Sequence, residues 1–135
     1  MNPRLIAAIA LALSAASALA ITPADLQASL AAEVRRVDPT FREFSARRGE
    51  AFYRATHGGD WSCATCHTDN PAATGSHAVT KKTVQPLAPA ANPERFTRAD
   101  KIDKWFKRNC NDVLKRACTP QEKGDLVAWL LNVKR

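Results

Sequence analysis

Methionine is almost absent from this sequence, since Met1 is the only one among 135 residues. The rest of the chain can therefore offer no thioether ligand to a metal. Sustained strand periodicity is also lacking, so we expect an all-α protein. The hydrophobic content of 45% is ordinary for one globular domain, and disorder, collagen-like structure and repeat arrays are not expected.

The first twenty residues have the composition of a secretory signal peptide. Arg4 precedes the uncharged apolar residues 5–13, and Ala18-Leu19-Ala20 matches a small-residue cleavage site. We expect cleavage there, leaving residues 21–135 as one soluble domain in the periplasm. An uncleaved membrane anchor is the alternative, but the serine-interrupted alanine run after Leu13 suits lipid poorly.

Basic residues outnumber acidic ones, with 20 Lys and Arg against 13 Asp and Glu, which gives a formal charge of +7. In a cytosolic protein this excess would point first to nucleic acid, but the expected export argues against such a partner. No membrane insertion is expected once residues 1–20 have been removed.

Four helices are expected from capping motifs and apolar periodicity. They run from Pro23 to about Val37, from Ser45 to Thr56, from the capping-box-like Thr97-Arg98-Ala99-Asp100 through Val113, and from Thr119-Pro120-Gln121-Glu122 to about Val133. Residues 68–94 contain several prolines and no sustained period, so we predict mainly an ordered loop there. So long a loop in a compact domain indicates that it covers a ligand or performs a function.

The motif C-x-x-C-H occupies residues 63–67. Its two thiols, Cys63 and Cys66, can bond to the vinyl groups of a haem while His67 reaches the iron from the same turn. In an exported all-α chain, one covalently attached haem c is the favoured interpretation. The alternatives are a thioredoxin-like dithiol, which should accompany a βαβ pattern, and half of a zinc site, which needs further ligands.

The ligand opposite His67 is left open by the sequence pattern. Small electron-transfer cytochromes c commonly use methionine at this position, and the mature chain has none. His57 and His77 lie ten residues before and after His67, and either would give a bis-histidine centre. Asn109 lies on the apolar face of the third expected helix, where it is either a buried, hydrogen-bonded amide or a ligand.

The two remaining cysteines, Cys110 and Cys118, flank the junction between the last two helices. An exported location favours a disulfide over free or metal-binding thiols. In the chain-entropy model, a bridge closing a loop of about nine residues contributes roughly 2.5 kcal/mol. It would also fix the backbone next to Asn109.

Several short segments of the sequence carry a family resemblance. They are residues 107–114 (KRNCNDVL), Cys118-Thr119-Pro120, Glu122-Lys123, Pro86-Leu87-Ala88-Pro89 and Arg95-Phe96-Thr97. Together they closely resemble the SHP (sphaeroides haem protein) family of monohaem c-type cytochromes, over about residues 63–131. The resemblance implies an all-α, class I cytochrome c-like haem domain with an extra N-terminal helix. Gly49 and Tyr53, expected to cross closely against the helix bearing Trp129, resemble the terminal helix pair of class I cytochromes c.

The resemblance to the SHP family implies that Asn109 is the distal ligand of the iron and that Cys110 pairs with Cys118. The related cytochromes c″ carry histidine at the position of Asn109 and are bis-histidine when oxidised. Leu87 and Phe96 lie in matching family segments, so they are expected beside the haem. Trp105 is expected there from its helix face.

The family resemblance also implies a function. It indicates an electron carrier, supplied by a dihaem cytochrome c, whose ferrous iron binds diatomics such as O2, NO or CO once Asn109 is released. The alternatives are an enzyme that detoxifies nitric oxide or oxygen species, resembling a nitric oxide dioxygenase, and a plain bis-histidine electron-transfer cytochrome. A basic face would suit an acidic redox partner, although such charges commonly just solvate helices. Its residues are Lys101, Lys104, Lys107, Arg108, Lys115 and Arg116.

Overall fold

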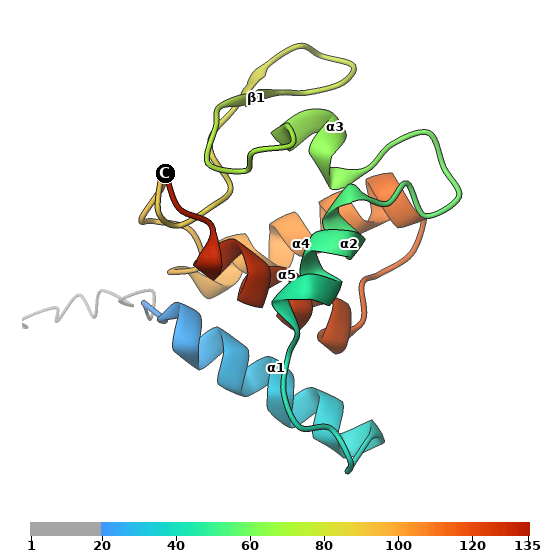
Figure 1. Cartoon of the computed structure of the whole chain (residues 1–135), viewed down its shortest axis with the longest axis vertical. Helices are drawn as coiled ribbons and strands as arrows, with labels where there is room; N and C mark the ends of the chain where they lie inside the picture. The colour runs from blue at the N-terminus through green and yellow to red at the C-terminus, as the bar shows by residue number, and fades with distance from the viewer. Residues whose placement is uncertain (1–19) are drawn as a thin grey trace, which may run out of the picture.

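The computed structural model describes residues 20–135, and in that part of the chain it contains five helices and one short hairpin (Figure 1). The elements are α1 (Pro23–Val37), α2 (Ala46–Arg54), α3 (Cys63–His67), β1 (Gly75–Ser76), β2 (Thr83–Val84), α4 (Ala99–Leu114) and α5 (Pro120–Asn132). The four expected helices are confirmed, and α3 is an additional helical turn formed by the C-x-x-C-H motif. The expected signal peptide lies outside the described residues, apart from Ala20.

Two helices begin at the capping boxes that the sequence predicts. At α1, the Thr22 hydroxyl accepts a hydrogen bond from the Asp25 backbone at 3.1 Å, and the Asp25 carboxylate accepts one from the Thr22 backbone at 2.8 Å. Thr119 and Glu122 make the same reciprocal pair at α5, at 3.1 and 2.8 Å. Each box satisfies backbone N–H groups that would otherwise lack partners.

The predicted start of α4 is wrong in its details. The N-cap is Arg98 rather than Thr97, and no side chain caps the helix. The Asp100 carboxylate is held instead by the Arg98 guanidinium, at 2.8 and 3.1 Å. The Thr97 hydroxyl donates to the carbonyl of Glu94 at 2.7 Å. The capping-box pattern fails here because a neighbouring arginine competes for the acidic residue.

α2 and α5 cross at close range, as Gly49 and Tyr53 predict. Gly49 is buried, and a side chain there would collide with the backbone of Asp125. Tyr53 is fully buried, with its ring centroid 4.7 Å from that of Trp129. The Tyr53 hydroxyl donates to the carbonyl of Thr68 at 2.6 Å, so the helix pair also fixes the chain directly after α3.

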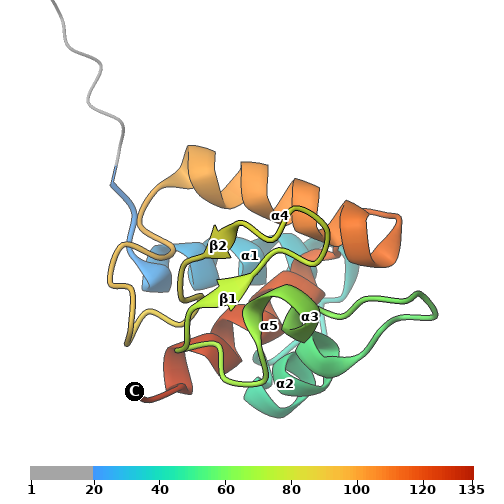
Figure 2. The same cartoon turned by 90° about the horizontal axis from the view of Figure 1, so that it is seen from above.

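α1 packs along α5 and completes the core (Figures 1 and 2). Leu26 and Leu30 of α1 contact Val127 of α5 and Ile102 of α4 in one buried cluster. Val127 has no exposed surface, because α1 covers a face of α5 other than the one that packs against α2.

The long segment after α3 is ordered, and it contains a feature that the sequence did not predict. β1 and β2 form an antiparallel hairpin in which Gly75 pairs with Val84 and Ser76 with Thr83 (Figure 2). Two-residue strands are too short to produce a period in the sequence. Backbone N–H groups of Leu87 and Ala88 then bind the carbonyl of Pro71, at 2.8 and 3.0 Å.

Within residues 20–135, no helix has the length and hydropathy needed to cross a membrane.

Candidate haem site

A cavity of about 560 Å³ lies between α3, the hairpin and the loop after it, α4 and α5. Its walls are mainly apolar, as in most cofactor sites. All nine residues that the sequence predicts for the site line this one cavity: Cys63, Cys66, His67, Leu87, Phe96, Trp105, Asn109, Cys110 and Cys118. Side chains far apart in the sequence therefore meet around a single space.

α3 presents the residues of the C-x-x-C-H motif. The short helix starts at Ser62, whose backbone N–H donates to the Thr65 hydroxyl at 2.9 Å. Cys63 and Cys66 are both free thiols and half-buried. The backbone N–H of Ala78, in the turn of the hairpin, donates to the Cys66 sulfur at 3.3 Å. The hairpin thus holds one of the two thiols in place.

Burial controls the protonation of two motif residues. It raises the pKa of the Cys63 thiol to about 11, and the neighbouring Cys66 adds to the rise. Burial also lowers the pKa of His67 to about 4, with a smaller contribution from the Arg95 cation. Before a haem is attached, Cys63 is therefore a thiol in neutral solution and His67 a neutral imidazole, the form whose ring nitrogen can bind a metal.

α4 brings Asn109 to the same cavity as His67. Asn109 is half-buried and lines the cavity, so both alternatives, a hydrogen-bonded amide and an iron ligand, stay open at this point. The next residue, Cys110, forms the predicted disulfide with Cys118. The bridge ties the last turn of α4 to the start of α5, and it thereby fixes the backbone beside Asn109.

The two other histidines differ in their position relative to the cavity. His57 is exposed and does not line it, and its Nε2 lies 2.9 Å from the carbonyl oxygen of Phe52. His77 does line the cavity, but its Nδ1 accepts hydrogen bonds from the backbone N–H groups of Val79 and Thr80, both at 3.2 Å. For the neutral ring this arrangement favours the tautomer with its proton on Nε2, so coordination of a metal through Nε2 would require the two hydrogen bonds to be given up.

Aromatic and aliphatic side chains form the remaining predicted walls. Phe96 has a φ of 63°, a strained conformation for a bulky residue. Trp105 is 42% exposed, so it stands at the rim of the cavity. The Lys104 ammonium and the Arg108 guanidinium lie 5.5 and 5.7 Å from the centre of its ring. The rim around Trp105 is therefore positively charged.

Sequence reasoning missed several wall residues, among them Trp61, Val84 and Arg95. Arg95 donates to the carbonyls of Pro86 and Gln85, at 2.8 and 2.9 Å, and thus closes the loop that follows the hairpin. Its position beside Phe96, within a segment that matches the family, was the available signal. Nothing in the sequence marks Val84, because its position depends on the pairing of the hairpin.

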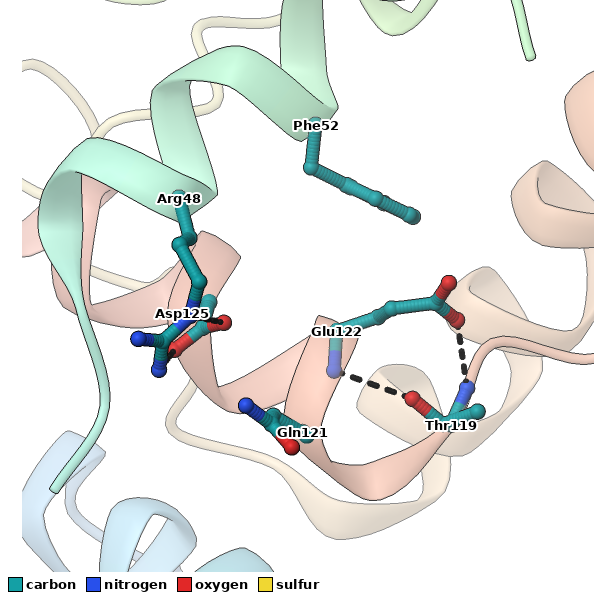
Figure 3. Close-up of a pocket in the computed structure, with 6 residues that line it drawn as sticks. All are labelled: Arg48, Phe52, Thr119, Gln121, Glu122 and Asp125. Carbon is teal, nitrogen blue, oxygen red and sulfur yellow. Dashed lines mark hydrogen bonds and ion pairs between the residues drawn. The ribbon is translucent and has the colours of Figure 1, made fainter. Parts of the chain in front are cut away.

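A second, smaller pocket of about 290 Å³ lies between α2 and the start of α5 (Figure 3). It is lined by Arg48, Phe52, Thr119, Gln121, Glu122 and Asp125. Its polar groups are occupied by structural contacts, since Arg48 pairs with Asp125 and Glu122 caps α5. These contacts explain why no ligand-binding motif pointed to this pocket.

The rival interpretations of the C-x-x-C-H motif find no structural support. Within residues 20–135, no three His, Cys, Asp or Glu side chains are grouped so as to hold a metal ion. The described elements also contain no βαβ unit, so a thioredoxin-like site lacks its structural context.

Comparisons with known proteins agree with the interpretation of this cavity as a haem site. Residues 39–130 match a family described as "Domain of unknown function (DUF1924)". The chain is 40% identical over 98 residues to cytochrome c″ of Methylophilus methylotrophus, covering 70% of this chain and 68% of that protein. It is 46% identical over 89 residues to the cytochrome c-type protein SHP of Cereibacter sphaeroides, covering 63% and 68%. The chain belongs to the SHP family of c-type cytochromes.

Solved structures of SHP-family proteins share the fold. The crystal structure of oxidized cytochrome c″ from M. methylotrophus matches with a TM-score of 0.74 at 34% identity, covering 84% of this chain and 95% of that one. The structure of oxidized SHP, an oxygen-binding cytochrome c, matches with a TM-score of 0.72 at 41% identity, covering 81% and 95%. The expected class I-like, all-α fold is thereby confirmed.

As a member of the SHP family, the protein carries one covalently attached haem c. The residues of the cavity fit this group. Two thiols stand one helical turn apart, a neutral imidazole follows them directly, and the walls are mainly apolar.

Proposed function

We propose that this SHP-family cytochrome carries electrons and also binds small diatomic molecules such as O2, NO or CO at its reduced haem. In this proposal Cys63 and Cys66 hold the haem, and His67 and Asn109 are its axial ligands. One observation carries it: Asn109, from α4, and His67, from α3, line the same cavity. His77 lines it too, but its Nδ1 already accepts two backbone hydrogen bonds.

When bound, the haem supplies a one-electron redox centre and, in its ferrous form, an affinity for diatomic gases. Asn109 contributes an amide oxygen, a neutral and hard donor that suits ferric iron better than ferrous iron. It should therefore leave more readily than an imidazole, and its N–H can then donate a hydrogen bond to the incoming molecule. The Cys110–Cys118 disulfide holds the backbone during this movement, so the side chain alone needs to rotate.

The relatives support this assignment. The solved structure of oxidized SHP is that of an oxygen-binding cytochrome c. A solution structure of M. methylotrophus cytochrome c″, with a TM-score of 0.73 at 35% identity and covering 84% of this chain and 94% of that one, addresses haem-ligand detachment. Oxygen binding in one relative and detachment of a haem ligand in the other both suit a site that can open.

The electron partner in this proposal is a redox protein with an acidic surface, such as a dihaem cytochrome c. Lys104 and Arg108 flank the exposed edge of Trp105, which lines the cavity. Charge complementarity at this edge would speed association, and salt would slow it. Reduction rates of wild type and Lys104→Glu, measured over a range of ionic strength, test this docking. Rates that ignore both salt and the substitution would exclude it.

The place of action is the periplasm, on this proposal, because residues 1–20 have the composition of a signal peptide. Expression of the full chain followed by cell fractionation tests this directly. The mature protein should appear in the periplasmic fraction, starting at Ile21. A full-length protein retained in the membrane fraction would contradict it.

Absorption spectra of the oxidised and reduced protein, before and after addition of CO, test the proposed ligation. We expect a high-spin ferrous spectrum that shifts promptly with CO. Asn109→Ala should change the ferric spectrum, whereas Asn111→Ala is a matched control, because it replaces an exposed asparagine on the other side of Cys110. A low-spin ferrous spectrum indifferent to CO, or a ferric spectrum unchanged in Asn109→Ala, would overturn the proposal.

A further inference from the structure

Among residues 20–135, Phe52 is shared by the haem cavity and the smaller pocket between α2 and α5. Its ring is half-buried and extends from α2 across the smaller pocket, on the side of Glu122 and Thr119 (Figure 3). The two spaces, of about 560 and 290 Å³, thus meet at one aromatic side chain.

The pocket also lies near the end of α4 that bears Asn109. Thr119 lines the pocket, and the preceding residue, Cys118, lines the cavity. Cys118 is bonded to Cys110, which directly follows Asn109. The shared ring of Phe52 thus joins the two spaces, and the disulfide holds the start of α5, beside the pocket, close to the proposed distal ligand.

Ion pairs hold the charged walls of the pocket. Arg48 is paired with Asp125 at 2.7 Å, and Glu122 is paired with Arg116 at 2.7 Å. The ring of Phe52 lies 4.6 Å, between centroids, from that of the exposed His57, and it also packs against a buried cluster that includes Leu126. Rotation of Phe52 therefore requires that His57, whose Nε2 lies 2.9 Å from the Phe52 carbonyl oxygen, move aside and that part of this packing be lost. This cost is the barrier that a gate needs.

We propose that Phe52 is the gate through which diatomic molecules pass between the surface pocket and the distal side of the haem. The gate rests on the proposed function, since it presumes that such molecules bind there. The charged residues that line the surface pocket are each paired with an opposite charge, so a diatomic molecule that enters the pocket meets no net charge. A gate changes the free-energy barrier that a molecule crosses on entry and exit, but not the free energies of the free and bound states. It therefore alters the association and dissociation rates by the same factor.

Flash photolysis of the CO complex of the reduced protein, together with CO dissociation rates, tests the gate. Phe52→Ala should raise both rates about fivefold, and Phe52→Trp should lower both, with the CO affinity unchanged; fivefold corresponds to a barrier change of about 1 kcal/mol. Phe44→Ala is the matched control, because Phe44 is half-buried like Phe52 but lines neither the cavity nor the pocket. It should leave the association rate within about twofold of wild type.

The outcomes separate the gate from the function on which it rests. A wild-type protein that binds no CO when reduced overturns the proposed function, and the gate with it. A wild-type protein that binds CO, with rates that do not change in Phe52→Ala and Phe52→Trp, overturns the gate alone. The gate is also overturned if only the dissociation rate changes and the CO affinity changes with it, because Phe52 would then act by contacting the bound molecule. Phe52→Leu provides the same test should the alanine variant fail to fold.

Discussion

Asp125 of α5 accepts two hydrogen bonds from the guanidinium of Arg48 on α2, at 2.7 and 2.9 Å. The same buried carboxylate accepts a third from the backbone N–H of Ser45, the N-cap of α2, at 2.7 Å. The hydrogen bonds between the Arg48 guanidinium and Asp125 raise the pKa of Arg48. Asp125 thus ties the start of α2 to α5, and so fixes how the helix that bears Phe52 meets the haem cavity.

Asp125→Ala should therefore destabilise the protein by about 2 kcal/mol, since it leaves the N-terminus of α2 and the exposed guanidinium of Arg48 without their acceptor. Urea denaturation followed by circular dichroism measures the loss. Asp103→Ala is the control, because Asp103 is exposed on α4, and it should change the stability by less than about 0.5 kcal/mol. Equal losses in the two variants would show that the contacts of Asp125 contribute nothing.

Removal of the disulfide should act on stability more than on the identity of the haem ligands. The double variant Cys110→Ala, Cys118→Ala frees a loop of about nine residues and should lose roughly 2.5 kcal/mol of unfolding free energy. Asn109 would remain on α4 but with a less restrained backbone, so the ferric spectrum should keep its form while CO binding becomes faster. An unfolding free energy equal to that of the wild type would contradict the first expectation, and an unchanged CO rate the second.

The free energy of unfolding should decrease in acid, in part because the Glu122 carboxylate becomes protonated. Hydrogen bonds from Arg116, chiefly, and from Thr119 lower the pKa of this carboxyl. Because the folded-state pKa lies below the unfolded-state value, the stabilisation is complete above the unfolded value and is lost as the pH falls through the folded one. Glu122→Gln should therefore be less stable than wild type at pH 7, by about 1 kcal/mol, with the difference shrinking below pH 4. A pH-independent difference would exclude this linkage.

His77 should prove dispensable for haem ligation. Its Nδ1 accepts two backbone hydrogen bonds, which favour the tautomer with the proton on Nε2 and would be lost if that nitrogen bound iron. His77→Ala should leave the ferric and ferrous spectra unchanged, in contrast to Asn109→Ala. Loss of the turn contacts should cost about 1 kcal/mol of stability. A shift from a low-spin to a high-spin ferrous spectrum in His77→Ala would instead reveal a bis-histidine centre.

The local features were accessible from the sequence because they depend on neighbouring residues. The capping boxes at Thr22 and Thr119 each need residues three positions apart, and the sequence placed both helices correctly. The close crossing of α2 and α5 was also predictable, because Gly49 followed by Tyr53 marks a helix face that permits close approach. The Cys110–Cys118 bridge needed only an expected oxidising compartment and a short separation.

Contacts between distant segments were decided by the tertiary structure alone. The position of Val127 in the core depends on α1, about 100 residues away, and the hairpin depends on a pairing that no period records. The sequence pattern left His77 and Asn109 as alternative ligands, and only the family resemblance favoured Asn109. The tertiary structure decided that both residues line one cavity with His67, and that the Nδ1 of His77 accepts hydrogen bonds from two backbone N–H groups. Such positions arise only when the chain has folded, because α3, the hairpin and α4 must first come together around the cavity.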